Sequence, residues 1–200
     1  MTIYAWPAAW KPSRFQLRII PNLRTFVGPY TPTTQVVDLL GERWAITVDL
    51  PITNDPIESA AREAYFDRLK GTANQIALGH LRLQAPQGTL RGSPTLSAAV
   101  AQLANVLPIQ TTAGATLRAG DMLGCGGQLF RVMADATANG SGLISAEVQG
   151  RARTALSSGA AVTWSAPTAN FMMKSPDGVP TVWQPGSITD AISVDLIEVW

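Results

Sequence analysis

Alternation of apolar and polar residues predicts β-strands at both ends of the chain. Over residues 13–20, Phe15, Leu17 and Ile19 alternate with polar side chains, which is the period of a half-buried strand. The same reasoning predicts strands at 23–27, 34–38, 43–50 and 192–200. The strands at 34–38 and 43–50 are expected to pair through a tight turn at Gly41-Glu42, and Asp195 is expected to face outwards.

One long helix is predicted between these strands. Asp55 is a good N-cap, Pro56 suits the first turn, and Glu58 is placed to complete a capping box. Gly71 is a suitable stop. The face expected to turn towards the core comprises Ile57, Ala61, Ala64, Tyr65 and Leu69, and the solvated face Glu58, Glu63 and Asp67. A strand over about 75–83 is expected to follow.

The middle of the chain has a different pattern. Residues 92–117 contain no charged side chain, and the apolar residues at 96–107 indicate a short helix or an irregular link. Short apolar segments then follow at 106–110, 128–133, 143–148 and 161–164. Asn139-Gly140 is a strong hairpin signal between two of them. Several short strands at this spacing predict a small barrel or sandwich.

These patterns together predict a discontinuous organisation. The expected fold is mainly β with one long α-helix, in the form of a β-sandwich with an inserted small β-barrel. Residues 1–88 plus 172–200 are assigned to the sandwich with the helix. Residues 89–171 are assigned to the inserted barrel module.

Composition adds that much of the surface is expected to be covered. Only 14% of residues are charged, against about 25% in ordinary soluble domains. The hydrophobic fraction of 46% and the mean hydropathy of +0.11 exclude intrinsic disorder. No stretch approaches the ~20 apolar residues of a membrane span. We therefore expect the uncharged segment 92–117 to be covered by other copies or partners, and the charged helix to face solvent.

The residue types in the sequence suit a protein–protein interface better than binding to nucleic acid or to a membrane. A net charge of +1 gives no electrostatic case for nucleic acid or an anionic membrane. Twelve arginines against three lysines, with six tryptophans, match the residue preferences of interface centres. The candidate interface residues are Trp6, Trp10, Arg14, Arg18, Val100 and Leu103. For Trp6 and Trp10, which lie in a proline-punctuated arm, core packing and partner contact are both open.

No constellation of catalytic, metal-binding or cofactor-binding residues is found. His80 is the only histidine and Cys125 the only cysteine, and neither has a catalytic signature around it, so structural roles are predicted for both. The glycine-rich segment 124–127 lacks the lysine of a phosphate-binding loop. The fragment 135–140 has the spacing of a calcium loop, but Ala146 stands where that loop needs a glutamate. We expect no enzyme activity and no cofactor.

Several short segments carry a resemblance to a known family. They are Leu117–Asp121, Gln128–Val132, Asn139–Gly142, Arg151–Arg153, Gly159–Val162, Pro167 and Phe171-Met172 in the central part, with 34–37 and 44–48 before it. Together they resemble the distal tail or minor tail proteins found at the tail tip and baseplate hub of tailed bacteriophages. One departure is Gly150, where the resemblance leads us to expect proline.

The resemblance implies a structural virion protein. Such a protein would form a homo-oligomeric ring, with six subunits expected, that connects the tail-tube protein to hub and baseplate proteins. The resemblance implies that the sandwich part, residues 1–88 plus 172–200, is the ring-forming unit. It would be synthesised in the host cytoplasm and end at the virion tail tip, without nucleic-acid specificity or membrane contact. The alternative is a soluble carbohydrate- or peptide-binding β module on a host-recognition assembly, with Trp164 as its exposed aromatic platform.

Overall fold

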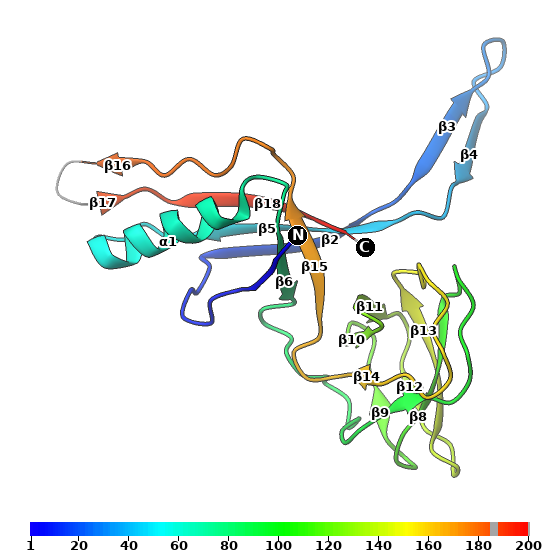
Figure 1. The fold of residues 1–200 in the computed structure, drawn as a ribbon. Coiled ribbons are helices and arrows are strands. Elements are labelled where there is room, and N and C mark those ends of the chain that lie inside the picture. Colours follow the sequence, from blue (N-terminus) through cyan, green and yellow to red (C-terminus); the bar gives the residue numbers. More distant parts are fainter. Residues whose placement is uncertain (185–187, 200) are drawn as a thin grey trace. The chain divides into compact units, whose positions relative to one another are not determined.

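The computed structural model describes residues 1–184 and 188–199 and divides the chain into two compact units (Figure 1). The first unit combines Met1–Arg18, Trp44–Leu81 and Ala169–Trp200. The second combines Ile19–Arg43 with Arg82–Thr168. The insertion thus runs from 82 to 168, against the predicted 89–171. Residues 19–43 belong with the inserted unit, which the sequence did not predict.

The first unit is built on one six-stranded sheet. Its strand order is β1 (Ile3–Ala5), β6 (Gln75–Gly79), β15 (Thr168–Met173), β18 (Ile192–Glu198), β5 (Arg43–Leu50) and β2 (Arg14–Ile20). β1 pairs in parallel with β6, whereas β18 pairs antiparallel with β15 and β5. The predicted strands at both ends of the chain are confirmed, including the exposure of Asp195.

The predicted pairing of 34–38 with 43–50 is wrong. β4 (Thr34–Asp38) pairs instead with β3 (Leu23–Val27), and β5 lies between β18 and β2. Trp44, Val48 and Leu50 have no exposed surface, which fits the place of β5 inside the six-stranded sheet between β18 and β2. A short hairpin at the edge could not bury them.

The predicted helix is confirmed as α1 (Pro56–Leu69), but two of its details differ. The Asp55 carboxylate caps the helix by accepting the Ile57 N–H at 2.9 Å, as expected. The expected capping box is wrong, because the Glu58 carboxylate accepts from Arg62 at 2.7 Å and from the Thr53 hydroxyl at 3.1 Å. The chain leaves the helix at Lys70, which is left-handed at φ 48°.

The buried face of α1 also differs from the prediction. Ile57, Ala61 and Ala64 are exposed, and the buried residues are Ser59, Arg62, Phe66 and Leu69. The two polar residues, Ser59 and Arg62, can be buried because each has a hydrogen-bond partner. The Ser59 hydroxyl lies 2.5 Å from that of Thr189, and Arg62 Nη1 donates to the Pro51 carbonyl at 2.6 Å. Most of α1 faces solvent, as expected.

The second unit contains a nearly closed six-stranded barrel. Its strand order is β14 (Val162–Thr163), β10 (Met122–Cys125), β11 (Gln128–Val132), β13 (Leu143–Gln149), β8 (Val106–Gln110) and β7 (Thr95–Leu96). The edges meet where Leu96 N–H donates to Ala160 O and Val162 N–H to Pro94 O, each at 2.9 Å. Apolar side chains including Leu107, Ile109, Leu123, Phe130 and Ile144 fill the interior. The predicted class, mainly β with one helix and a small barrel, is confirmed.

Turn chemistry in the barrel follows the sequence in part. The Asn139 amide oxygen accepts the N–H groups of Ser141 and Leu143, each at 3.0 Å, so the predicted turn is present. It joins β12 (Ala136–Thr137) to β13, but β12 pairs with β9 (Thr116–Leu117) and not with β13. Residues 97–105 form an irregular link. Much of the uncharged segment is exposed on the single chain.

A buried carboxylate organises the entry to the barrel. Asp121 is 2% exposed and accepts the backbone N–H groups of Gln87 at 2.7 Å, Gly88 at 3.3 Å and Arg118 at 2.8 Å. These three bonds compensate the carboxylate for its lost water. The entry segment is thereby attached to the barrel.

Among the described residues, no helix is long and apolar enough to cross a membrane.

Candidate functional site: an exposed apolar hairpin

The hairpin formed by β3 and β4 carries the largest group of exposed hydrophobic side chains among the described residues (Figure 1). Its strands pair from Leu23 opposite Asp38 to Val27 opposite Thr34. The tip is closed by the Gly28 N–H, which donates to the Thr33 carbonyl at 3.0 Å. The hairpin is therefore a regular ribbon with a defined register.

Almost the whole hairpin is exposed. Every residue from 20 to 40 is exposed except Gly28, including Phe26 at 58% and Tyr30 at 97%. The exposed large hydrophobic side chains are Ile20, Leu23, Phe26, Val27, Tyr30, Val36, Val37, Leu39 and Leu40. Only Arg24 and Asp38 are charged in this segment. An exposed apolar surface of this extent marks an interaction site.

The register divides these side chains between two faces, neither of which is packed. One face carries Arg24, Phe26, Gln35 and Val37, and the other carries Leu23, Thr25, Val27, Thr34, Val36 and Asp38. An isolated two-stranded hairpin is only marginally stable in water. Its outer backbone edges also remain open for pairing. A partner that covers this ribbon would satisfy both needs.

The base of the hairpin is attached to the barrel of the same unit. Glu42 Oε1 accepts the backbone N–H groups of Gly150 and Arg151, each at 3.1 Å. Arg153 Nη2 donates to the Glu42 carbonyl at 3.4 Å. This explains why Gly150 departs from the expected proline: its φ is 90° and its N–H is used, and proline allows neither.

Two of the six predicted interface residues lie in the chain's own packing. Trp10 is 9% exposed, with its ring centroid 5.0 Å from that of Tyr65 and 5.9 Å from that of Phe66. Val100 is 4% exposed in the barrel core. Of the two roles left open for Trp10, the structure supports core packing. Neither residue offers a surface to a partner.

The other four predicted interface residues keep accessible surface. Trp6 is half-buried and meets Trp10 edge to face at 5.7 Å. Arg14 and Arg18 are exposed on the same side of β2, and Leu103 is 38% exposed. The β3–β4 hairpin was not among the predicted interface residues. The sequence does indicate a surface that lacks a buried side, because apolar residues occupy both alternating positions of the strands at 23–27 and 34–38.

Cys125 and His80, the single cysteine and the single histidine of the sequence, belong to different units. The Cys125 side chain is 3% exposed in the barrel, and burial raises the pKa of its thiol, which keeps it protonated at neutral pH. His80 belongs to the other unit, where its ring lies 5.2 Å from that of Phe15. Among the described residues there is no cluster of three or more potential metal ligands.

Trp164 does not present the open platform that the carbohydrate-binding alternative requires. Its ring packs partly against the barrel core, and its Nε1 donates to the Gly92 carbonyl at 2.8 Å. The Arg91 guanidinium lies over the ring, 5.0 Å from its centroid. A sugar would have to displace this arginine to stack on the indole.

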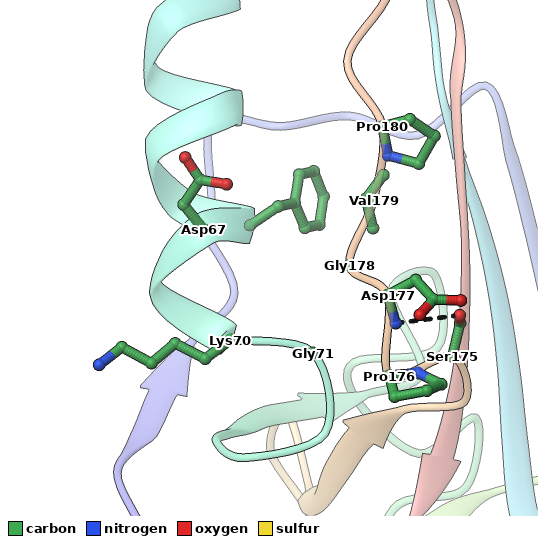
Figure 2. A pocket seen from close by; sticks show the side chains of 10 residues that line it. Asp67, Lys70, Gly71, Ser175, Pro176, Asp177, Gly178, Val179 and Pro180 are labelled. Carbon is green, nitrogen blue, oxygen red and sulfur yellow. Dashed lines mark hydrogen bonds between the residues drawn. The ribbon is translucent and has the colours of Figure 1, made fainter.

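An open groove of about 600 Å³ lies in the first unit, between the end of α1 and residues 175–180 (Figure 2). Asp67 and Lys70 come from the helix, and Figure 2 shows the Lys70 side chain directed away from the opposite segment. Across the groove, the Asp177 N–H donates to the Ser175 hydroxyl at 3.3 Å. The lining has neither histidine nor cysteine and offers no nucleophile paired with a base.

Comparisons with known proteins add no assignment. No family model matches the chain, and no curated protein is significantly similar to it. The class supported by the fold is a mainly β protein with an inserted small barrel, and its most distinctive surface is the β3–β4 hairpin.

Proposed function

We propose that the protein is a structural component of a phage tail tip, which assembles into a ring that connects the tail tube to the hub or baseplate. The observation that carries this proposal is the β3–β4 hairpin, apolar and exposed on both faces. The motif resemblance supplies the setting in the virion. The hairpin supplies a physical means by which one subunit can hold its neighbour.

The hairpin is large enough to carry a stable contact. Its 20 exposed residues fall in the range of about 20–30 residues per side of a standard interface. Fully burying one large apolar side chain contributes about 1.5–3 kcal/mol. The nine large apolar side chains are 36–97% exposed, so covering both faces of the hairpin would supply on the order of 10 kcal/mol. That is comparable to the ~4–15 kcal/mol that association costs, so a specific fit decides the affinity.

The charge balance favours contact between copies. A net charge of +1 gives little long-range repulsion between subunits. The low charged fraction of 14% is expected of a subunit whose surface is shared with neighbours. In a ring each subunit buries two different patches, which reduces the area left to solvent further.

Light scattering and negative-stain microscopy of the purified protein test the ring. The wild type should form a closed ring of fixed symmetry at micromolar concentration. Phe26→Asp combined with Val36→Asp should give a folded monomer, because charges on both faces of the hairpin oppose burial. The matched control is Ala64→Asp, an exposed position on α1. A wild-type monomer, or rings that survive the hairpin variant, would contradict the proposal.

Labelling of virions tests the location. An antibody against the protein should decorate one end of the tail in particles from the phage or prophage that carries the gene. Label on the capsid, along the whole tail, or absent from purified particles would argue against a tail-tip role. The ring and its location are thus tested separately.

A further inference from the structure

We propose that the hairpin docks on a second copy of this chain, on a row formed by Ile52, Asp190 and Val182. This inference rests on the proposed ring and names the surface that receives the hairpin. The hairpin face involved is the one that carries Arg24, Phe26 and Val37.

The position of the row follows from the strand pairing in the first unit. Thr53 bridges Thr189, and β17 (Ile188–Thr189) pairs with β16 (Trp183–Gln184) so that Thr189 lies opposite Trp183. The antiparallel register then places Asp190 between Ile52 and Val182. The Asp190 N–H donates to the Val182 carbonyl at 3.1 Å, which agrees with this alignment.

The row faces away from α1. The side chains of Thr53 and Thr189 both turn towards the helix, where they bond Glu58 and Ser59. Because side chains alternate along a strand, their neighbours Ile52 and Asp190 point to the other side. Ile52 is 59% exposed and Val182 is 51% exposed. The row is thus an accessible pair of apolar side chains with one carboxylate between them.

The chosen hairpin face has the complementary arrangement. Arg24 lies directly opposite Val37, and Phe26 is the next residue on the same side of β3. Each surface therefore has one charged side chain next to two apolar ones, and the two charges have opposite signs; the hairpin face also carries Gln35. Neither Arg24 nor Asp190 makes an ion pair within the described part of the chain, and the Asp190 carboxylate accepts only the Gln184 amide, at 2.6 Å.

The partner is a second copy because this chain itself carries both surfaces and their charges are opposite, with Arg24 on the hairpin face and Asp190 in the row. The hairpin face and the row are two different patches of the chain. A subunit that gives one patch and receives its neighbour on the other makes a head-to-tail contact, the kind that closes into a ring.

Charge reversal tests the contact. Arg24→Asp and Asp190→Arg should each weaken ring formation at least tenfold in the concentration needed for assembly. The two variants mixed in equal amounts, and the double variant, should assemble again. Lys11→Asp and Glu63→Arg are matched charge reversals at exposed sites outside both surfaces and should assemble like the wild type. Failure of both rescues would overturn the pairing of Arg24 with Asp190.

Chemical cross-linking tests proximity without relying on the charge variants. A chain with Phe26→Cys mixed with a chain with Val182→Cys should give a cross-linked dimer with a short bis-maleimide reagent. The wild type, whose Cys125 is buried, should give none. If rings form but this cross-link is absent, or Phe26→Cys is captured only by another tail protein, the docking site is wrong while the ring stands. If the wild type forms no ring, the proposed function itself fails.

Discussion

The carboxylate of Glu42 holds the backbone of Gly150, with 3.1 Å between Oε1 and the glycine nitrogen. These residues are 108 positions apart, and their contact attaches the base of the hairpin to the barrel. The same oxygen accepts the Arg151 N–H. One half-buried glutamate therefore fixes the base of the proposed docking hairpin to the barrel.

Removing this acceptor should loosen the base of the hairpin. We expect Glu42→Ala to lower the free energy of unfolding by about 1–3 kcal/mol, because two backbone N–H groups lose their partner. Glu42→Gln retains an oxygen acceptor and should lose less. Chemical denaturation followed by fluorescence measures the effect, with the exposed Glu63→Ala as control. Equal stability of Glu42→Ala and the wild type would refute this role.

A methyl group should not be tolerated at Gly71. Its φ is +61°, and a Cβ there would lie 2.1 Å from the Pro176 carbonyl oxygen. Gly71→Ala therefore combines a left-handed backbone with a steric clash, and we expect a loss of about 1–3 kcal/mol in unfolding free energy. Gly140→Ala is the matched control, because nothing lies within 4 Å of its Cβ position. Similar melting temperatures for the two variants would contradict the prediction.

The Asp135 carboxylate should make stability sensitive to acid. The Ala119 N–H bond, at 2.8 Å, and the Arg118 side chain lower the pKa of this carboxyl. A lowered folded pKa means that the stabilisation is present above the ordinary value of about 3.9 and is lost as pH falls through the folded pKa.

Asp135→Asn provides the comparison for this effect. The variant should be less stable than the wild type at pH 7, and the difference should shrink as pH falls below about 4. Melting curves from pH 7 to pH 2 measure it. A difference that is constant over this range would show that ionisation of Asp135 is not its cause.

Tyr65 should titrate unusually late. Burial raises the pKa of its phenol to about 12, and the hydroxyl donates to the Ala5 carbonyl at 3.0 Å. In a Tyr4→Phe, Tyr30→Phe background, phenolate absorbance should therefore rise near pH 12 instead of near the ordinary pH 10.

The same shift has a consequence for stability in alkali. Because the folded pKa is raised, the stabilisation is complete below about pH 10 and is lost as pH rises towards 12. Tyr65→Phe removes the ionisation, so its unfolding free energy should decline less over that interval. A titration midpoint near pH 10 in the native protein would contradict both expectations.

Local features were largely predictable from the sequence alone. Alternation located β2, β5 and β18, because one side of β5 and of β18 is buried, one side of β2 is half-buried, and the period of two survives. Asp55 and Pro56 marked the start of α1, since capping depends on neighbouring residues only. The class of fold also followed from residue types and spacing.

Pairing and burial across long separations required the tertiary structure. The sequence alone could not show that β4 pairs with β3, because both neighbours of β4 along the chain were plausible strands. Nor could it show that Arg62 is buried, because its partner is the backbone carbonyl of Pro51, which every residue possesses. The attachment of the hairpin through Glu42 depends on a contact between residues 108 positions apart. Local sequence patterns specify the strands and the helix, whereas which strands pair and which side chains are buried is decided by contacts in the folded chain.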